Sequence, residues 1–283
     1  VLLQLGQLER AVRCYDRAIA LNPNNASAYC NRGIAFQRLK QTAAALLDYG
    51  KAIAIKVDYA EAYCNRGSAL HELGKLPEAI ADFDMAISLR PNFPAAYCNR
   101  GVVLFELDQL RAAVDSHDRA IALAPHYADA YYNRGNALQA LNQFDRAIAD
   151  YEQALALKPG HAEACNNRGI ALQKLGWHDR AVAAHDQAIA LNPEYAEAYC
   201  NRGIALQQLK RFADARADYE KAIALQPRYA EAYCNRGSYF LEQSDPVAAL
   251  ADYDRAIELK PDYAEAYCNR GISLHGQGRY DQA

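Results

Sequence analysis

Residues 198–203 read AYCNRG, and the same six letters stand at 28–33, 62–67, 96–101, 232–237 and 266–271. Two variants, AYYNRG at 130–135 and ACNNRG at 164–169, complete eight copies spaced by 34 residues. A fixed period of this length indicates one small unit repeated along the chain, so we predict an array of repeats. An array offers a long repeated surface for another chain rather than one catalytic pocket.

The period divides the chain into complete and partial units. The complete units are 26–59, 60–93, 94–127, 128–161, 162–195, 196–229 and 230–263, and the partial units are 1–25 and 264–283. We therefore predict a single array over residues 1–283. Because the chain starts inside a unit without a Met and stops where a helix should begin, we expect it to be a fragment of a longer protein.

The unit 196–229 predicts two helices joined by a short turn, the first over about 196–209 and the second over about 213–225. Pro227 ends the second helix, because proline lacks the amide hydrogen and disfavours helix in the residue before it. Small residues such as Gly203 allow the two helices to approach closely, and an aromatic ring fills the space between them.

The order of residue types in each unit resembles that of the tetratricopeptide repeat. The family's aromatic, small, bulky, alanine, aromatic, alanine and proline positions correspond to Tyr199, Gly203, Leu206, Ala215, Tyr219, Ala222 and Pro227. The resemblance covers the whole chain. It implies an all-α fold, a right-handed superhelical solenoid of stacked antiparallel helix pairs, and a concave groove that binds peptides or proteins.

One arginine in each unit departs from the family pattern, which has an apolar residue there. The arginines are Arg32, Arg66, Arg100, Arg134, Arg168, Arg202, Arg236 and Arg270. A half-buried guanidinium needs an acceptor, so we predict an ion pair within each unit, such as Arg202 with Asp218. Two units have Ser116 and Ala184 in place of the aspartate, each followed by a histidine, and there we expect a substitute network. The alternative is that the arginine extends to water.

An asparagine occupies one position on the opposite face of the first helix in every unit. This asparagine row is Asn31, Asn65, Asn99, Asn133, Asn167, Asn201, Asn235 and Asn269. An amide has donors and an acceptor that match those of a peptide bond. Steps of roughly 10 Å between units would meet an extended peptide about every three residues. We predict that the row binds a peptide backbone; the alternative is that it only fixes the stacking of the units.

Other side chains on this face add charge and apolar contact. Glu61, Asp129, Glu163, Glu197, Glu231 and Glu265 make one edge acidic, and Ile34, Val102, Ile170, Ile204 and Ile272 are apolar. Basic residues are few, so a partner with an extended backbone and some basic residues fits best.

Composition argues against several classes of function. The net charge of −3 and the pI of about 6.2 do not suit nucleic acid. No apolar run approaches the ~18 residues of a membrane span. The eight cysteines show no CxxC or Cys/His ligand spacing, so we expect free thiols in a reducing compartment, the cytoplasm, and no metal or cofactor. No catalytic set of residues recurs, so we predict a binding protein and not an enzyme.

Two rival functions and one assembly remain open. The asparagine row is similar to that in the repeat arrays of O-linked N-acetylglucosamine transferases, which implies a substrate-recognition arm of a larger enzyme. RNA binding, known in related 35-residue helical repeats, is disfavoured by the period and the charge. The partial units leave Val1, Leu2 and Leu3 at one end and an unpaired helix at the other, which predicts head-to-tail self-association.

Overall fold

The computed structural model describes residues 2–3 and 5–279, which form sixteen helices and no strand. In chain order the helices are α1 (Leu8–Leu21), α2 (Ala26–Arg38), α3 (Thr42–Ile55), α4 (Ala60–Glu72), α5 (Leu76–Leu89), α6 (Pro94–Glu106), α7 (Leu110–Leu123), α8 (Ala128–Ala140), α9 (Phe144–Leu157), α10 (Ala162–Lys174), α11 (His178–Leu191), α12 (Ala196–Gln208), α13 (Phe212–Leu225), α14 (Ala230–Glu242), α15 (Pro246–Leu259) and α16 (Ala264–Gly276). Val1 and Ala283, which mark the ends of the predicted array, lie outside the described residues.

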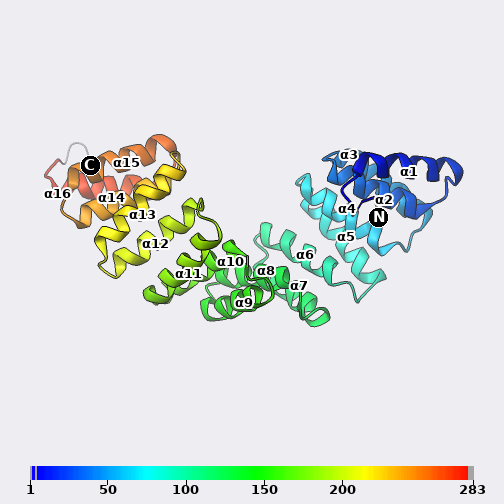
Figure 1. The fold of residues 1–283 in the computed structure, drawn as a ribbon, viewed down its shortest axis with the longest axis horizontal. Coiled ribbons are helices and arrows are strands. Elements are labelled where there is room, and N and C mark those ends of the chain that lie inside the picture. The colour runs from blue at the N-terminus through cyan, green and yellow to red at the C-terminus, as the bar shows by residue number, and fades with distance from the viewer. Residues whose placement is uncertain (1, 4, 280–283) are drawn as a thin grey trace. The chain divides into compact units, whose positions relative to one another are not determined.

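Backbone contacts group the chain into two compact units, 1–142 and 143–283. In the first, α2 packs with α3, α4 with α5 and α6 with α7, and each pair also contacts the next (Figure 1). The second unit repeats the pattern with α10 and α11, α12 and α13, and α14 and α15 (Figure 1). Each unit by itself is a stack of helix pairs, which confirms the all-α solenoid class; that the whole chain forms a single array stays a prediction.

A glycine on the first helix of each pair lets an aromatic ring of the second helix lie directly against the backbone. A Cβ atom added to Gly203 of α12 would lie 2.8 Å from Cε1 of Tyr219 on α13. Likewise, a Cβ atom added to Gly101 would lie 2.5 Å from Cε1 of the His117 imidazole. These rings are buried, and fully buried alanines surround them, as at Ala215 of α13. The predicted packing of small residues around an aromatic ring is confirmed.

The turn inside each helix pair depends on one residue in the left-handed conformation. After α12, Lys210 has a φ of 61° and Arg211 donates its backbone N–H to Leu206 O at 2.9 Å, as in a Schellman ending. Gly74 and Gly176 occupy the same position without steric cost. The helices end at Gln208 and begin at Phe212, each within one residue of the predicted bounds.

Candidate peptide-binding face

The predicted site residues all lie on first helices of the pairs. The asparagine row falls on α2, α4, α6, α8, α10, α12, α14 and α16, and every member is half-buried. Around it, Ile170 and Ile204 are also half-buried, as is Glu231, whereas Glu163 and Glu197 are exposed. The face is therefore polar along the row, with apolar contact beside it.

The side-chain N–H groups of six members of the row bind the preceding repeat; these are Asn65, Asn99, Asn133, Asn201, Asn235 and Asn269. Asn235 Nδ2 donates to Cys200 Sγ at 3.3 Å, and Asn65 Nδ2 donates to Cys30 Sγ at 3.5 Å. Where a serine is available, Asn99 Nδ2 donates to Ser68 Oγ at 3.2 Å. The asparagines therefore fix the stacking of neighbouring first helices, which is the structural role given above as the alternative to peptide binding.

These bonds use the amide nitrogen and hold the amide group in one orientation. In the described part of the chain, no partner is seen for Oδ1 of Asn65, Asn99 or Asn235. An amide oxygen accepts up to two hydrogen bonds. The row therefore combines a fixed side chain with an acceptor on a half-buried face, and the structural and binding roles are compatible.

The cysteine position, occupied by Cys200 and its equivalents, is replaced in one repeat by Asn166, which is 1% exposed. Its Oδ1 accepts from Asn201 Nδ2 at 3.2 Å and lies 3.0 Å from Nδ1 of His185. Its Nδ2 donates to the hydroxyl of Tyr195 at 3.4 Å. Because an amide oxygen only accepts, His185 carries its proton on Nδ1. This buried network was missed from the sequence, although the exchange of cysteine for asparagine was visible there.

The two buried imidazoles predict loss of stability in mild acid. Burial lowers the pKa of His117 to about 4 and that of His185 to about 3, from 6.5. The unfolded chain takes up protons below pH 6.5 while the folded chain does not, so stability falls as the pH falls from 6.5 towards these values. Between pH 6 and pH 5 each imidazole should cost about 1 kcal/mol of unfolding free energy.

Urea unfolding of the wild type and of His117→Phe at several pH values checks this expectation. Phenylalanine is the matched replacement, since Phe83 fills the same position in another repeat and is fully buried. The variant should lose about half of the acid sensitivity between pH 6 and pH 5. An unchanged pH dependence would show that His117 takes up its proton over the same pH range in the folded and the unfolded chain.

The acidic edge of the face is partly neutralised by basic residues at the ends of the second helices. Arg90 donates to Glu61 Oε1, and Lys260 Nζ donates to Glu231 Oε1 at 3.2 Å. Exposed pairs of this kind stabilise a protein by less than about 1 kcal/mol, but they lower the negative potential that a partner meets. The edge is less acidic than the sequence alone indicates.

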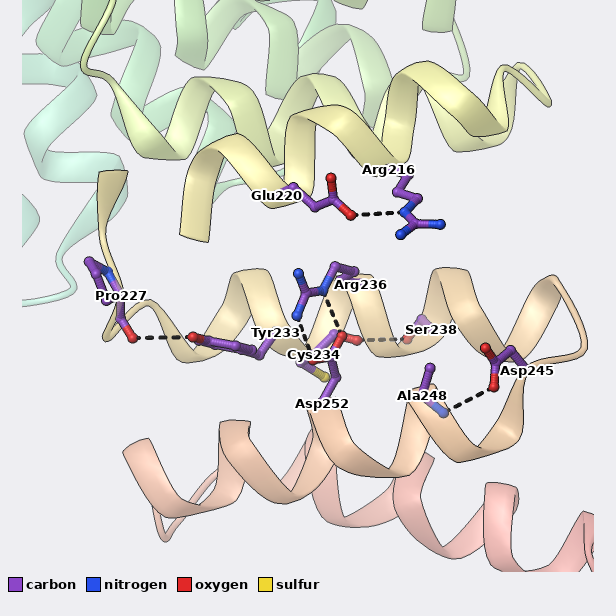
Figure 2. A network of polar contacts seen from close by, with 10 residues as sticks. All are labelled: Arg216, Glu220, Pro227, Tyr233, Cys234, Arg236, Ser238, Asp245, Ala248 and Asp252. Atoms are coloured by element: carbon purple, nitrogen blue, oxygen red, sulfur yellow. Dashed lines mark hydrogen bonds and ion pairs between the residues drawn. The ribbon is translucent and has the colours of Figure 1, made fainter. Parts of the chain in front are cut away.

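The predicted ion pair inside the repeat is confirmed for Arg32, Arg66, Arg202 and Arg236. Arg202 Nε and Nη2 donate to the two carboxylate oxygens of Asp218, both at 2.7 Å. Figure 2 shows the equivalent bond between Arg236 of α14 and Asp252 of α15. The hydrogen bond with Asp218 raises the pKa of Arg202 above its ordinary value, so the guanidinium stays charged. The aspartate is buried, and its two oxygens are satisfied by the planar fork of the arginine.

The same arginine also reaches the preceding repeat, which the sequence analysis did not foresee. Arg202 Nη1 donates to Asp186 Oδ1 at 2.6 Å. The two repeats without the buried aspartate use substitutes, as expected. Arg100 Nη1 donates to Ser116 Oγ at 2.8 Å, and Arg168 Nη2 donates to Gln187 Oε1 at 2.7 Å. The arginine therefore joins two second helices through one first helix.

Neither a metal site nor a membrane span is seen in the described residues. No group of three or more metal-binding side chains occurs among residues 2–3 and 5–279. Over the same residues no helix combines the length and the apolar character needed to cross a bilayer. All eight cysteines are free thiols, and six of them are buried; Cys14 and Cys268 are exposed.

Comparison with known protein families matches the repeats along the chain. The description "TPR repeat" matches residues 1–40, 38–74, 67–108, 103–142 and 178–210, and "Tetratricopeptide repeat" matches 128–161, 200–264 and 252–283. The chain belongs to the tetratricopeptide-repeat family. Tetratricopeptide-repeat proteins are protein-interaction scaffolds. A search of curated proteins gave no match.

Solved structures of other tetratricopeptide-repeat proteins share the fold. The APC/C hetero-tetramer Cut9–Hcn1 superposes with a TM-score of 0.71 at 16% identity, over 94% of this chain and 52% of that chain. This chain therefore spans about half the length of that one. YrrB, described as a TPR protein with an unusual peptide-binding site, has a TM-score of 0.54 at 25% identity, over 69% of this chain and 97% of its own. MamA has a TM-score of 0.54 at 28% identity, over 61% and 94%.

Proposed function

We propose that this tetratricopeptide-repeat chain is a scaffold that binds an extended segment of another protein along the asparagine row. The observation that carries the proposal is the oriented amide on six first helices, α4, α6, α8, α12, α14 and α16. Its nitrogen is held by the preceding repeat, as in the bond from Asn235 to Cys200, so little side-chain entropy is lost when its oxygen accepts a bond from a ligand. The peptide-binding site of YrrB, a similar repeat protein, supports this choice of ligand class.

The surroundings of the row suit a backbone ligand with few sequence requirements. Amide oxygens of successive repeats accept N–H groups that every residue of an extended peptide except proline provides. Ile170 and Ile204 give apolar contact beside the row. The exposed carboxylates of Glu163 and Glu197 favour a lysine or arginine in the ligand, mainly through the rate of association.

Peptide capture by matched variants tests the proposal. The test variant combines Asn65→Ala, Asn133→Ala and Asn235→Ala, and it should capture a diverse peptide pool at least tenfold more weakly than the wild type, because three acceptors are lost. In all three residues the amide nitrogen donates to a cysteine sulfur of the preceding repeat, at 3.5, 3.8 and 3.3 Å. Circular dichroism must show that the variant is folded.

The matched control removes the other end of each bond. It combines Cys30→Ala, Cys98→Ala and Cys200→Ala, which breaks the same contacts between repeats but keeps every amide. Capture should stay close to that of the wild type. If both triple variants lose capture equally, the asparagines act only through stacking; if neither loses it, the ligand binds elsewhere.

Other expectations from the sequence stay predictions. No observation in the described residues favours the substrate-recognition arm of a glycosyltransferase over a free-standing scaffold. Head-to-tail self-association and a cytoplasmic location are likewise untested.

A further inference from the structure

A tyrosine of the first helix packs in the same way in most repeats. At this tyrosine position, the guanidinium carbon of the repeat's arginine lies between 5.4 and 5.6 Å from the ring centroid in five repeats. The rings are those of Tyr29, Tyr63, Tyr131, Tyr199 and Tyr233. In Figure 2, the hydroxyl of Tyr233 donates to the carbonyl oxygen of Pro227, at 3.4 Å. The position therefore places a phenol ring beside a guanidinium in five repeats, and in the repeat of Tyr233 a backbone carbonyl also accepts the hydroxyl.

In the repeat 162–195 the tyrosine position holds Cys165, and the space of the ring is empty. A cavity of about 340 Å³ opens there. Its apolar walls include Leu155 at the end of α9 and Leu191 at the end of α11, and Cys165 of α10 forms its base. The volume lies at the lower end of the range for pockets that bind small ligands, about 300–1,000 Å³.

The polar groups of the cavity are those that surround the ring in other repeats. Arg168 corresponds to the stacking arginine, and Pro159 corresponds to Pro227, whose carbonyl accepts the tyrosine hydroxyl. Gln187 occupies the position of Lys51, whose Nζ lies 5.5 Å from the ring centroid of Tyr29. The cavity thus keeps the environment of a tyrosine side chain but lacks the side chain.

Arg168, which lines the cavity, also lacks the carboxylate partner that the equivalent arginines have in other repeats. Its Nε is buried and has no hydrogen-bond partner, because Ala184 stands where other repeats have an aspartate. Nη2 donates to Gln187 Oε1 at 2.7 Å. A buried guanidinium N–H without an acceptor is unfavourable. An aromatic ring in the cavity would give this guanidinium a cation–π contact like that of Arg202 with Tyr199, which is separate from the bond between Arg202 Nε and Asp218.

We propose that this cavity, lined by Cys165, Arg168 and Pro159, binds the side chain of a tyrosine from a partner polypeptide. Tyrosine is preferred to phenylalanine because the carbonyl of Pro159 accepts its hydroxyl, as the carbonyl of Pro227 does for Tyr233. The cavity is separate from the asparagine row, since Asn167 lies about 160° around α10 from Cys165. An aromatic side chain anchored in a pocket is a common centre of affinity in protein interfaces.

The binding of p-cresol, which has the side-chain structure of tyrosine, tests the proposal by NMR titration or calorimetry on the whole chain. The wild type should bind one p-cresol per chain saturably, and toluene several-fold more weakly. The variant Cys165→Tyr restores the residue of the other repeats and fills the cavity, so it should bind p-cresol at least tenfold more weakly. No saturable binding to the wild type, or equal binding to the variant, overturns the proposal.

A second variant opens an equivalent vacancy. Tyr199→Cys should raise the stoichiometry from one p-cresol to two, whereas an unchanged stoichiometry would show that the tyrosine position does not bind a free ring. The variant Asn65→Ala, Asn133→Ala, Asn235→Ala should bind p-cresol like the wild type, which separates this site from the proposed peptide-binding face.

The capped tripeptide Ala-Tyr-Ala should bind more tightly than p-cresol; weaker binding would contradict a polypeptide partner.

Discussion

Replacement of Asp218 by alanine should lower the free energy of unfolding by about 2 kcal/mol. The side chain of Asp218 is 7% exposed and accepts two hydrogen bonds from Arg202, which is itself only 22% exposed. Without the carboxylate, a half-buried guanidinium loses its bidentate acceptor and has only Asp186 left. Loss of one partner from a fully buried pair costs about 3–5 kcal/mol, and the residual exposure of Arg202 reduces that figure.

The control is Asp186→Ala, which removes the other carboxylate bound to the same guanidinium. Asp186 is 52% exposed, so its loss should cost less than about 1 kcal/mol. Equilibrium urea unfolding gives both values, and hydrogen exchange of the amides of α12 and α13 shows whether the loss is local. If the two variants were equally stable, burial of the carboxylate would contribute nothing and the arginine would be held by either aspartate.

The contrast between these two aspartates shows what the sequence could predict. The 34-residue period and helical geometry place Asp218 beside Arg202 inside one repeat, so that pair was predicted. The contact with Asp186 crosses to the preceding repeat. This contact depends on the rise and rotation from one repeat to the next, and the 34-residue period of the sequence does not specify either quantity.

Prediction of the contacts of the asparagine row from the sequence was limited in the same way. A helical wheel places Asn235 opposite the stripe that packs inside the repeat, and in the structure the residue is half-buried. The wheel does not show that its nitrogen reaches Cys200 in the preceding repeat. Likewise, the exchange of tyrosine for Cys165 was legible in the sequence, but the cavity that it leaves depends on the side chains around it. Within a repeat the sequence was a reliable guide; between repeats the structure was needed.

Replacement of Gly203 by alanine should destabilise the array, although alanine is the better helix former. The new Cβ would lie 2.8 Å from Cε1 and 3.1 Å from Cδ1 of Tyr219. The ring cannot move aside easily, because it is 1% exposed and its hydroxyl donates to Gln207 Oε1 at 2.9 Å. Overpacking of a core costs about 1–3 kcal/mol, and the change should lower the free energy of unfolding by about 2 kcal/mol.

Gly50→Ala is the matched control, since Gly50 also lies inside a helix, α3, but no atom lies within 4 Å of its added Cβ. There the helix preference alone acts, and alanine should stabilise by about 0.5–1 kcal/mol. The same substitution should therefore change stability in opposite directions at the two positions, as measured by urea unfolding of each variant. If Gly203→Ala also stabilised the chain, the two helices of the pair would have to separate freely, and the close approach of Tyr219 to the backbone would not be what fixes their packing.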